Sequence, residues 1–160
     1  DHLNDYLRAT LRRSRADTGT LADELEMLRA YLAIMQVRMG HRLRYRIQCP
    51  PELASHPLPI MLLQPLVENA IRHGLEPKVE GGEVVIDVSV SGPTLQIRIC
   101  DDGIGLPGGQ AHSGVGISNI RERLQALFGG RAALWLGARP EGGVEARVSL
   151  LRQGVFGGAS

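Results

Sequence analysis

Apolar residues recur at helical spacing near the start of the chain. Leu3, Leu7 and Leu11 mark a short amphipathic helix. After Thr20, a longer stripe advances in alternating steps of four and three residues, through Leu21, Leu25, Leu28, Leu32, Met35 and Met39. Thr20 can cap this helix together with Asp23, and a glycine supplies its end. So narrow a seam favours a helical hairpin or dimerisation stalk; the alternative is that both helices pack on the domain that follows.

Beyond Gly40, apolar and polar residues alternate, which is typical of strands. The stretch LRYRIQC at 43–49 is one strand candidate. Residues 84–90 and 95–100 alternate on either side of a Gly-Pro pair, so they predict a hairpin with one buried face. Two further strands are expected near the end, the last with four inward apolar residues: Val144, Ala146, Val148 and Leu150. The proline-rich stretch PPELASHPLP is interpreted as a linker.

Two more helices are expected among these strands. The helix that starts at Gly116 has one apolar side and ends at a glycine pair; that side holds Ile117, Ile120, Leu124, Leu127 and Phe128. The stretch LLQPLVENAIRHG at 62–74 separates into two sides at about 100° per residue. One side is apolar, and the other holds Pro65, Glu68, Asn69 and Arg72. A Glu-Asn pair followed one turn later by Arg, on the face turned away from the core, makes this helix a candidate for chemistry.

A carboxylate interrupts the core-facing row of the second hairpin strand. Counting alternate residues from Leu95, the next inward position after Ile99 is Asp101. The alternative is that the strand ends one residue earlier and Asp101 opens a turn. Two glycine-rich stretches follow, DDGIGLPGG and HSGVGISNIRERL, and the second opens a helix. Glycine-rich loops at helix N-termini bind phosphate through free N–H groups, so the order of these two loops after the Glu-Asn helix favours a phosphate-binding site.

Composition limits the classes of protein that remain. The chain has 160 residues, 43% of them hydrophobic, which suits one main domain with at most an appendage. A net charge of +1 gives no electrostatic case for binding nucleic acid or an anionic membrane. Cys49 and Cys100 form no metal or redox motif, as expected of reduced thiols in a cytosolic domain. No apolar run approaches the ~20 residues of a membrane span.

The three motifs together resemble a known fold. LVENAIRHG, DDGIGL and GVGISNIRERL resemble the N, G1 and G2 boxes of the Bergerat ATP-binding fold, which histidine kinases share with gyrase-type ATPases, MutL and heat-shock chaperones. The stretch LADELEMLRAYLAIMQVRMGHRL followed by LPIMLLQPLVENAIRHG is similar to the LytS/AlgZ-type sensor histidine kinases, and the resemblance covers about residues 3–151. It implies an α+β fold: a two-layer α/β sandwich with a mixed sheet backed by three helices, preceded by a helical stalk.

The resemblance also divides the chain. Residues 1–40 are expected to be the end of the dimerisation and phosphotransfer helices, 41–152 the ATP-binding kinase domain, and 153–160 a disordered tail. Homodimerisation is expected through the N-terminal helices. The implied setting is the cytoplasmic part of a bacterial inner-membrane sensor, with membrane contact only through upstream segments and no direct contact with nucleic acid.

The family pattern assigns roles to individual residues. Asn69 resembles the asparagine that ligates Mg²⁺ at the ATP phosphates, and Arg72 and His73 resemble residues that approach the phosphate chain, although helix-end packing is an equal alternative for His73. Asp101 resembles the aspartate that accepts a hydrogen bond from the adenine amino group. The remaining implied contacts are the adenine floor at Gly103 and Gly105, the lid glycines Gly114 and Gly116, the nearby Ser118 and Asn119, and a lid at 106–113.

Two departures from the family pattern bear on activity. Gyrase-type hydrolases carry a catalytic glutamate four residues before the metal-binding asparagine, where this chain has Pro65, so efficient hydrolysis is not expected. Glu68 is the candidate substitute acid or base. Relatives usually read Gly-Thr where this chain reads Gly143-Val144, so one polar contact near adenine is lost and modest affinity is expected.

The acceptor histidine of such kinases lies in a motif like NPHFLFN, which this chain lacks. The resemblance therefore implies the catalytic part of an ATP-dependent protein-histidine kinase, inactive alone, whose phosphoryl group goes to a histidine upstream and then to a response regulator, often of the LytTR type. The alternatives are a degenerate nucleotide-binding or dimerisation module without kinase activity and, less in keeping with Pro65, a gyrase-type ATPase machine.

Overall fold

A five-stranded mixed sheet forms one layer of the computed structural model, which describes residues 2–13, 18–105 and 115–152. The strand order is β2-β4-β5-β7-β6, with β2 and β4 parallel and the other neighbours antiparallel. Its strands are β2 (Leu43–Gln48), β4 (Gly82–Ser91), β5 (Thr94–Asp101), β6 (Ala132–Ala138) and β7 (Val144–Leu151). The mixed sheet expected from the sequence is confirmed.

Alternation decides which side of each strand is buried. Every second residue is buried along β5 and along β4 as far as Val88, whereas Val90 on the same row is 36% exposed. The register pairs Ile86 with Ile99 and Val84 with Asp101. The predicted hairpin and its single buried face are therefore confirmed. Because β5 extends through Asp101, the alternative in which the strand ends at Cys100 is wrong. The last strand, β7, likewise buries the four residues predicted to face inward.

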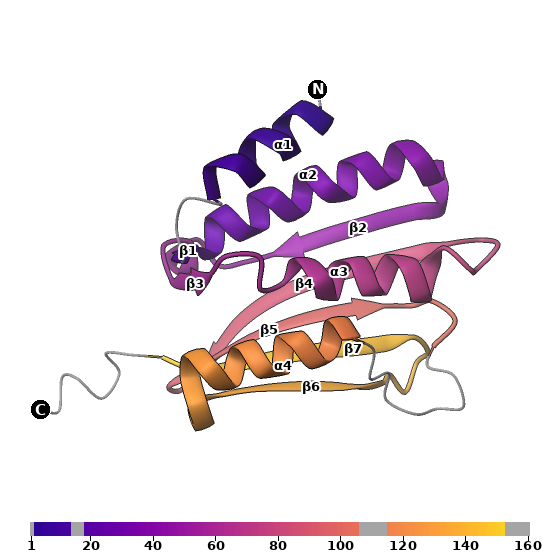
Figure 1. Cartoon of the computed structure of the whole chain (residues 1–160). Coiled ribbons are helices and arrows are strands. Elements are labelled where there is room, and N and C mark those ends of the chain that lie inside the picture. Colours follow the sequence, from indigo (N-terminus) through magenta and orange to yellow (C-terminus); the bar gives the residue numbers. More distant parts are fainter. Residues whose placement is uncertain (1, 14–17, 106–114, 153–160) are drawn as a thin grey trace, which may run out of the picture.

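Helices cover one face of this sheet (Figure 1). They are α2 (Leu21–Met39), α3 (Gln64–Asn69) with its continuation η3 (Ala70–Leu75), and α4 (Val115–Phe128). The three-helix layer implied by the resemblance is confirmed. Short 3₁₀ turns connect the layers at η1 (Gly40–Arg42), η2 (Pro51–Leu53) and η5 (Gly129–Arg131). No helix among the described residues is both long and apolar enough to cross a membrane.

The seam of α2 is part of the domain core. Thr20 caps the helix as predicted: its hydroxyl accepts the Asp23 N–H, and the Asp23 carboxylate accepts the Thr20 N–H, each at 3.2 Å. All six seam residues from Leu21 to Met39 belong to the one buried cluster that also contains the sheet residues. The prediction that this seam faces a partner helix is therefore wrong for α2, because the sheet and α3 already cover it.

The first helix, α1 (His2–Arg13), packs along α2 to form a helical hairpin (Figure 1). Tyr6 of α1 and Tyr31 of α2 make the aromatic contact between them, with ring centroids 6.3 Å apart. Leu3 and Leu7 of the predicted apolar stripe are exposed. Dimerisation through this helix stays a prediction.

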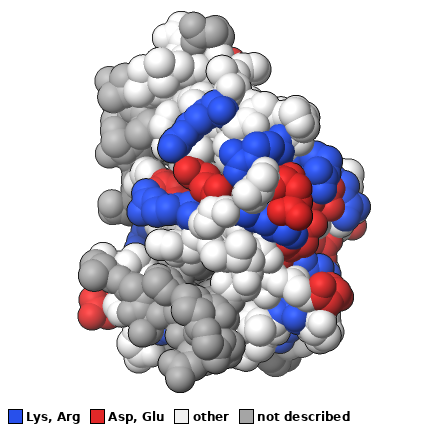
Figure 2. All heavy atoms as spheres, turned by 90° about the vertical axis from the view of Figure 1, so that its right-hand side faces the viewer, with Lys and Arg blue, Asp and Glu red and all other residues white. Residues whose placement is uncertain are grey.

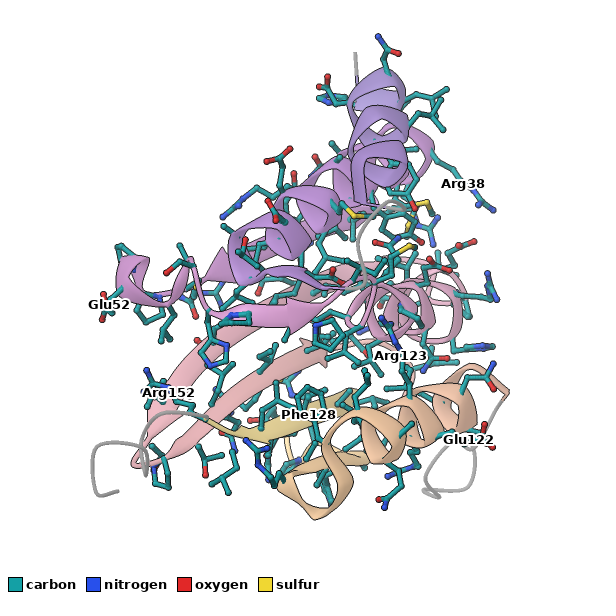
Figure 3. The ribbon with its side chains drawn as sticks, turned by 60° about the vertical axis from the view of Figure 1, so that its left-hand side comes forward. Arg38, Glu52, Glu122, Arg123, Phe128 and Arg152 are labelled. Carbon is teal, nitrogen blue, oxygen red and sulfur yellow. The ribbon has the colours of Figure 1, made fainter. Side chains whose placement is uncertain are left out.

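Two local predictions need correction. The PPELASHPLP stretch is more than a linker, since it contains η2 and the strand β3 (Pro57–Pro59), which pairs antiparallel with β1 (Thr18–Thr20) in a small second sheet. On α4, Ile117, Ile120 and Leu124 are buried as predicted, but Leu127 is 54% exposed. Phe128 follows it and packs against the core cluster from the helix side of the sheet (Figure 3).

Candidate functional site

Asp101 ends the buried row of β5 and is only 2% exposed. Its Oδ1 accepts the N–H of Gly103 at 2.9 Å. Burial raises the pKa of Asp101 to about 6, because the charged form loses water; hydrogen bonds from the Gly103 and Val144 N–H groups and the charge of Arg139 oppose this rise. The position of this carboxylate, anticipated from strand alternation alone, is confirmed. A buried carboxylate with a perturbed pKa marks a candidate site.

The end of η3 is packed directly on the turn that follows Asp101. A Cβ placed on Gly74 would lie 2.7 Å from Oδ1 of Asp101, and one on Gly103 would collide with the backbone of Gly74. The N–H of Ile104 donates to the carbonyl of Gly74 at 3.0 Å. Gly105 has φ +84°, a conformation that favours glycine. The helix with the Glu-Asn pair and the first glycine-rich turn are therefore joined through backbone that only glycine permits.

Residues from the hairpin between β6 and β7 support Asp101 from its other side. Arg139 Nη1 donates to the carbonyl oxygen of Asp101 at 2.8 Å. Gly143 has φ +87°, and a Cβ there would collide with the same carbonyl. Sequence reasoning considered Gly143-Val144 only for a missing hydroxyl and did not single out Arg139. The double glycine before the last core strand was the one available signal that a backbone passes close by.

Lys78 holds the backbone of Asp102, the residue after Asp101. The sequence analysis did not predict this role. Lys78 Nζ donates to the carbonyl of Asp102 at 2.9 Å, and Asp102 Oδ1 accepts the N–H of Glu83 at 2.7 Å. The turn is thus tied to the loop before β4 as well as to η3. Lys78 is the only lysine in the chain, and it belongs to no motif or periodic pattern in the sequence that would have indicated this role.

Asn69 is the last residue of α3, and the π-helix η3 starts immediately after it. The sequence predicted one regular helix over 62–74, so the change of helix type is a correction to that expectation. Glu68 and Asn69 are half-buried, whereas Arg72 and His73 are exposed. The apolar side predicted for this helix is buried. A single π-turn within a helix is frequently found at functional sites.

Tyr31 of α2 lies close to the polar side of α3. Burial, with a smaller contribution from the nearby carboxylate of Glu68, raises the pKa of Tyr31 to about 12, although the charge of Arg72 opposes the rise. The phenol therefore keeps its proton at neutral pH and can donate a hydrogen bond. Sequence periodicity had placed Tyr31 outside the apolar seam without assigning it a role.

The start of α4 supplies the remaining candidates. Gly116, Ser118 and Asn119 are exposed in its first turns, and α4 contacts α3. A Cβ on Gly116 would meet nothing within 4 Å, so the structure gives no steric reason for glycine there. Gly114 and the predicted lid at 106–113 lie outside the described residues, as does the tail at 153–160.

Lysine, arginine, aspartate and glutamate side chains gather on the side of the molecule that lies on the right in Figure 1 (Figure 2). Arg38 pairs with Glu76 at 3.1 Å, and Arg42 donates to the carbonyls of Glu76, Lys78 and Val79. Within the described residues, no group of three or more His, Cys, Asp or Glu could hold a metal by itself. Asn69 offers one amide oxygen on the polar side of α3, beside the carboxylate of Glu68. Such a donor fits Mg²⁺, which keeps several waters and is usually completed by substrate phosphates.

Comparison with known proteins gives consistent relatives. Residues 56–154 match the family model described as histidine kinase-, DNA gyrase B-, and HSP90-like ATPase, and residues 1–43 match the histidine kinase model. The sensor histidine kinase BtsS of Escherichia coli is 36% identical over 141 residues, covering 88% of this chain and 25% of that protein. The sensor histidine kinase/phosphatase LytS of Staphylococcus aureus is 35% identical over 147 residues, covering 82% and 25%. The chain thus spans about a quarter of the length of these curated relatives.

Solved structures show the same fold. The histidine kinase domain of a blue-light activated histidine kinase from Erythrobacter litoralis superposes with a TM-score of 0.64 at 19% identity, covering 94% of this chain and 79% of that one. The catalytic domain of histidine kinase ThkA superposes with a TM-score of 0.64 at 13% identity, covering 83% and 95%.

Proposed function

Because the chain belongs to the family of histidine kinase-, DNA gyrase B- and HSP90-like ATPases, we propose that it is the ATP-binding catalytic part of a sensor histidine kinase. In this proposal it donates the γ-phosphoryl group of ATP to a histidine outside these 160 residues. The observation that carries the proposal is the Asp101 carboxylate, which is buried at a strand end between two glycine-lined backbone contacts.

Asp101 selects adenine in this proposal. Its ionised carboxylate accepts a hydrogen bond from the adenine amino group, and the close packing of Gly74 against Gly103 leaves backbone rather than side chains beside the base. Gly105 continues this floor with its positive φ. Buried polar groups discriminate strongly between ligands, because a base without a matching donor would leave the carboxylate unpaired.

The polar side of α3 and η3 faces the phosphates. Asn69 would hold Mg²⁺, which when bound supplies positive charge at the phosphate oxygens. Arg72 and His73 lie exposed on the next turn, where they approach the phosphate chain. Glu68, half-buried beside Asn69, is the candidate acid or base. Gly116, Ser118 and Asn119 at the start of α4 complete the phosphate end, with Gly114 and the lid at 106–113 assigned by the family pattern alone.

Transfer of the γ-phosphoryl group to a histidine is favoured over hydrolysis of ATP. Pro65, in the first turn of α3, can neither accept a proton nor orient a water molecule. The phosphoryl group instead passes to the upstream histidine and from there to a response regulator, for which a LytTR type is the finer proposal. The fold relative ThkA has been solved in complex with a response regulator, TrrA. We further propose a homodimer formed by the N-terminal helices of the complete protein and a position at the cytoplasmic side of the bacterial inner membrane.

Calorimetric titration with Mg-ADP tests the proposal. Asp101→Ala and Asn69→Ala should each weaken binding, since one removes the adenine contact and the other the metal ligand. Asp87→Ala is the matched control, because it removes a carboxylate from the outward face of the same hairpin, where its ion pair with Arg98 is partly exposed. Wild-type affinity in both site variants would refute the site. No binding by the wild-type protein would favour the degenerate module.

A further inference from the structure

The helix that carries Asn69 starts without a capping residue of its own. Leu63 occupies the N-cap position of α3 and makes no side-chain cap, although Ser, Thr, Asp or Asn is preferred there. Pro65 within the first turn has no N–H to satisfy. The regular α-helical part is only six residues long, and so short a helix is not stable by itself in water. Its orientation must therefore come from contacts with other elements.

Glu24 of α2 supplies that contact. Its Oε1 accepts the N–H of Met61 at 3.0 Å, and its Oε2 accepts the N–H of Leu63 at 2.9 Å. The residue is only 1% exposed. Removing a carboxylate from water is costly unless it is hydrogen-bonded, and these two bonds offset part of that cost. Met61 has φ +56°, the only positive value among the described non-glycine residues, so the carboxylate also holds a strained turn.

These contacts tie α2 to the candidate metal ligand. Asn69 follows Leu63 by six residues, which along a helix is about 9 Å, and each residue of rotation would turn its side chain by about 100°. The other end of the segment is already held by Gly74 against Gly103. With both ends fixed, the direction in which Asn69 points is determined by where Glu24 places the first turn.

We propose that Glu24 is a positioning residue for the phosphate side of the nucleotide site, acting through α3 on Asn69. The proposal rests on the proposed function, because it presupposes that Asn69 binds the metal. The two hydrogen bonds of Glu24 go to the turn ahead of α3, whereas Asp101 at the adenine end is supported by Gly103, Val144 and Arg139. A positioning role therefore affects the metal-dependent part of nucleotide affinity, whereas a purely structural role would weaken the whole site or the whole fold.

The experiment compares the affinity for ADP with and without Mg²⁺ in the full chain. Glu24→Gln keeps the size of the side chain, but its amide nitrogen would face one of the two N–H donors. Glu26→Gln is the matched control, since it makes the same change of charge at an exposed position on the same helix. Glu24→Asp keeps the charge and shortens the reach by one carbon. Melting temperature is recorded for every variant.

In the wild type, Mg²⁺ should strengthen ADP binding by about tenfold or more, the equivalent of one well-placed ligand. Glu24→Gln should lose most of that gain while its metal-free affinity stays within about threefold of wild type. The gain in ADP affinity from Mg²⁺ in Glu24→Asp should lie between the gains of wild type and Glu24→Gln. Glu26→Gln should behave as wild type. An undiminished Mg²⁺ effect in Glu24→Gln, equal losses with and without Mg²⁺, or unfolding of both Glu24 variants would overturn the positioning role. No Mg²⁺ effect in the wild type would instead count against the proposed function.

Discussion

Gly74 lies so close to Asp101 that a Cβ on Gly74 would be 2.7 Å from the carboxylate oxygen Oδ1. The two residues come from different elements, the end of η3 and the end of β5. Only a residue without a side chain allows the helix and the carboxylate to approach in this way. The adenine end and the phosphate end of the proposed site are therefore parts of one packed unit.

Gly74→Ala should displace Asp101, because carboxylate and methyl group cannot occupy the same space. We expect the affinity for Mg-ADP to fall by about tenfold or more, with a loss of stability of about 1–3 kcal/mol from overpacking. Gly130→Ala is a suitable control, since a Cβ there would meet nothing within 4 Å. Calorimetry and thermal melting would measure both effects. Unchanged ADP affinity in Gly74→Ala would show that the contact does not shape the site.

Adenine binding should depend on pH through Asp101. The pKa of this carboxyl is raised to about 6, so protonation at lower pH removes the acceptor for the adenine amino group. Below that pKa the affinity should fall by about tenfold per pH unit. Adenosine is the ligand of choice, because the terminal phosphate of a nucleotide titrates in the same range. Asp101→Asn should bind adenosine weakly at every pH. If the affinity of the wild type for adenosine did not change with pH, the assignment of Asp101 to the adenine amino group would be refuted.

The same group has the opposite effect on folding. Its folded-state pKa lies above the unfolded value of 3.8, so its protonation contributes stability that is fully present at low pH and is lost as pH rises through about 6. Acidification from pH 7 to 5 should therefore raise the contribution of Asp101 to stability while adenosine binding declines. Comparing the melting temperatures of wild type and Asp101→Asn across this range isolates that contribution.

Leu28→Ala in α2 should destabilise the nucleotide domain, because Leu28 is fully buried in the same core as the sheet. The expected loss is about 3 kcal/mol, from lost burial and the cavity left behind. Val37→Ala on the same helix is the control; its side chain is 77% exposed, and its effect should stay below about 0.5 kcal/mol. Denaturant unfolding gives both values. A small loss of unfolding free energy in Leu28→Ala would indicate that the domain does not depend on α2 for its stability.

The chain alone should bind nucleotide without phosphorylating itself. Incubation with labelled ATP should give no acid-labile, base-stable phosphate, because no histidine here stands in an acceptor motif. A longer version with the upstream acceptor helix and Asn69→Ala should become labelled when the two are mixed, provided mixed dimers form. Robust phosphohistidine on the chain alone would contradict the assignment of the acceptor to an upstream segment.

Release of free phosphate should be slow throughout, since Pro65 provides no base for water. A continuous phosphate assay under saturating Mg-ATP would measure the rate, with the Asn69→Ala variant as background. Rapid hydrolysis without phosphoryl transfer would favour the ATPase-machine alternative instead.

Sequence patterning predicted the parts of the fold that depend on periodicity. Strand alternation placed Asp101 on the buried row, and the two-sided helix at 62–74 separated the buried residues from Glu68 and Asn69. It could not say what covers a narrow apolar seam, so α2 was assigned to a stalk although the sheet buries it. Nor could it find Arg139 or Glu24, which act through backbone groups brought close only by folding.

The burial of α2 has a practical consequence for protein engineering. Sensor modules are exchanged by joining one protein's input segment to another's catalytic domain, and a join at residue 41 would follow the apparent change from helix to strand. Such a chimera would replace one wall of the sandwich together with the Glu24 carboxylate that orients α3. A join ahead of the Thr20 cap keeps α2 with the sheet on which it packs. The packed unit therefore includes the whole helix α2 ahead of the first strand of the five-stranded sheet.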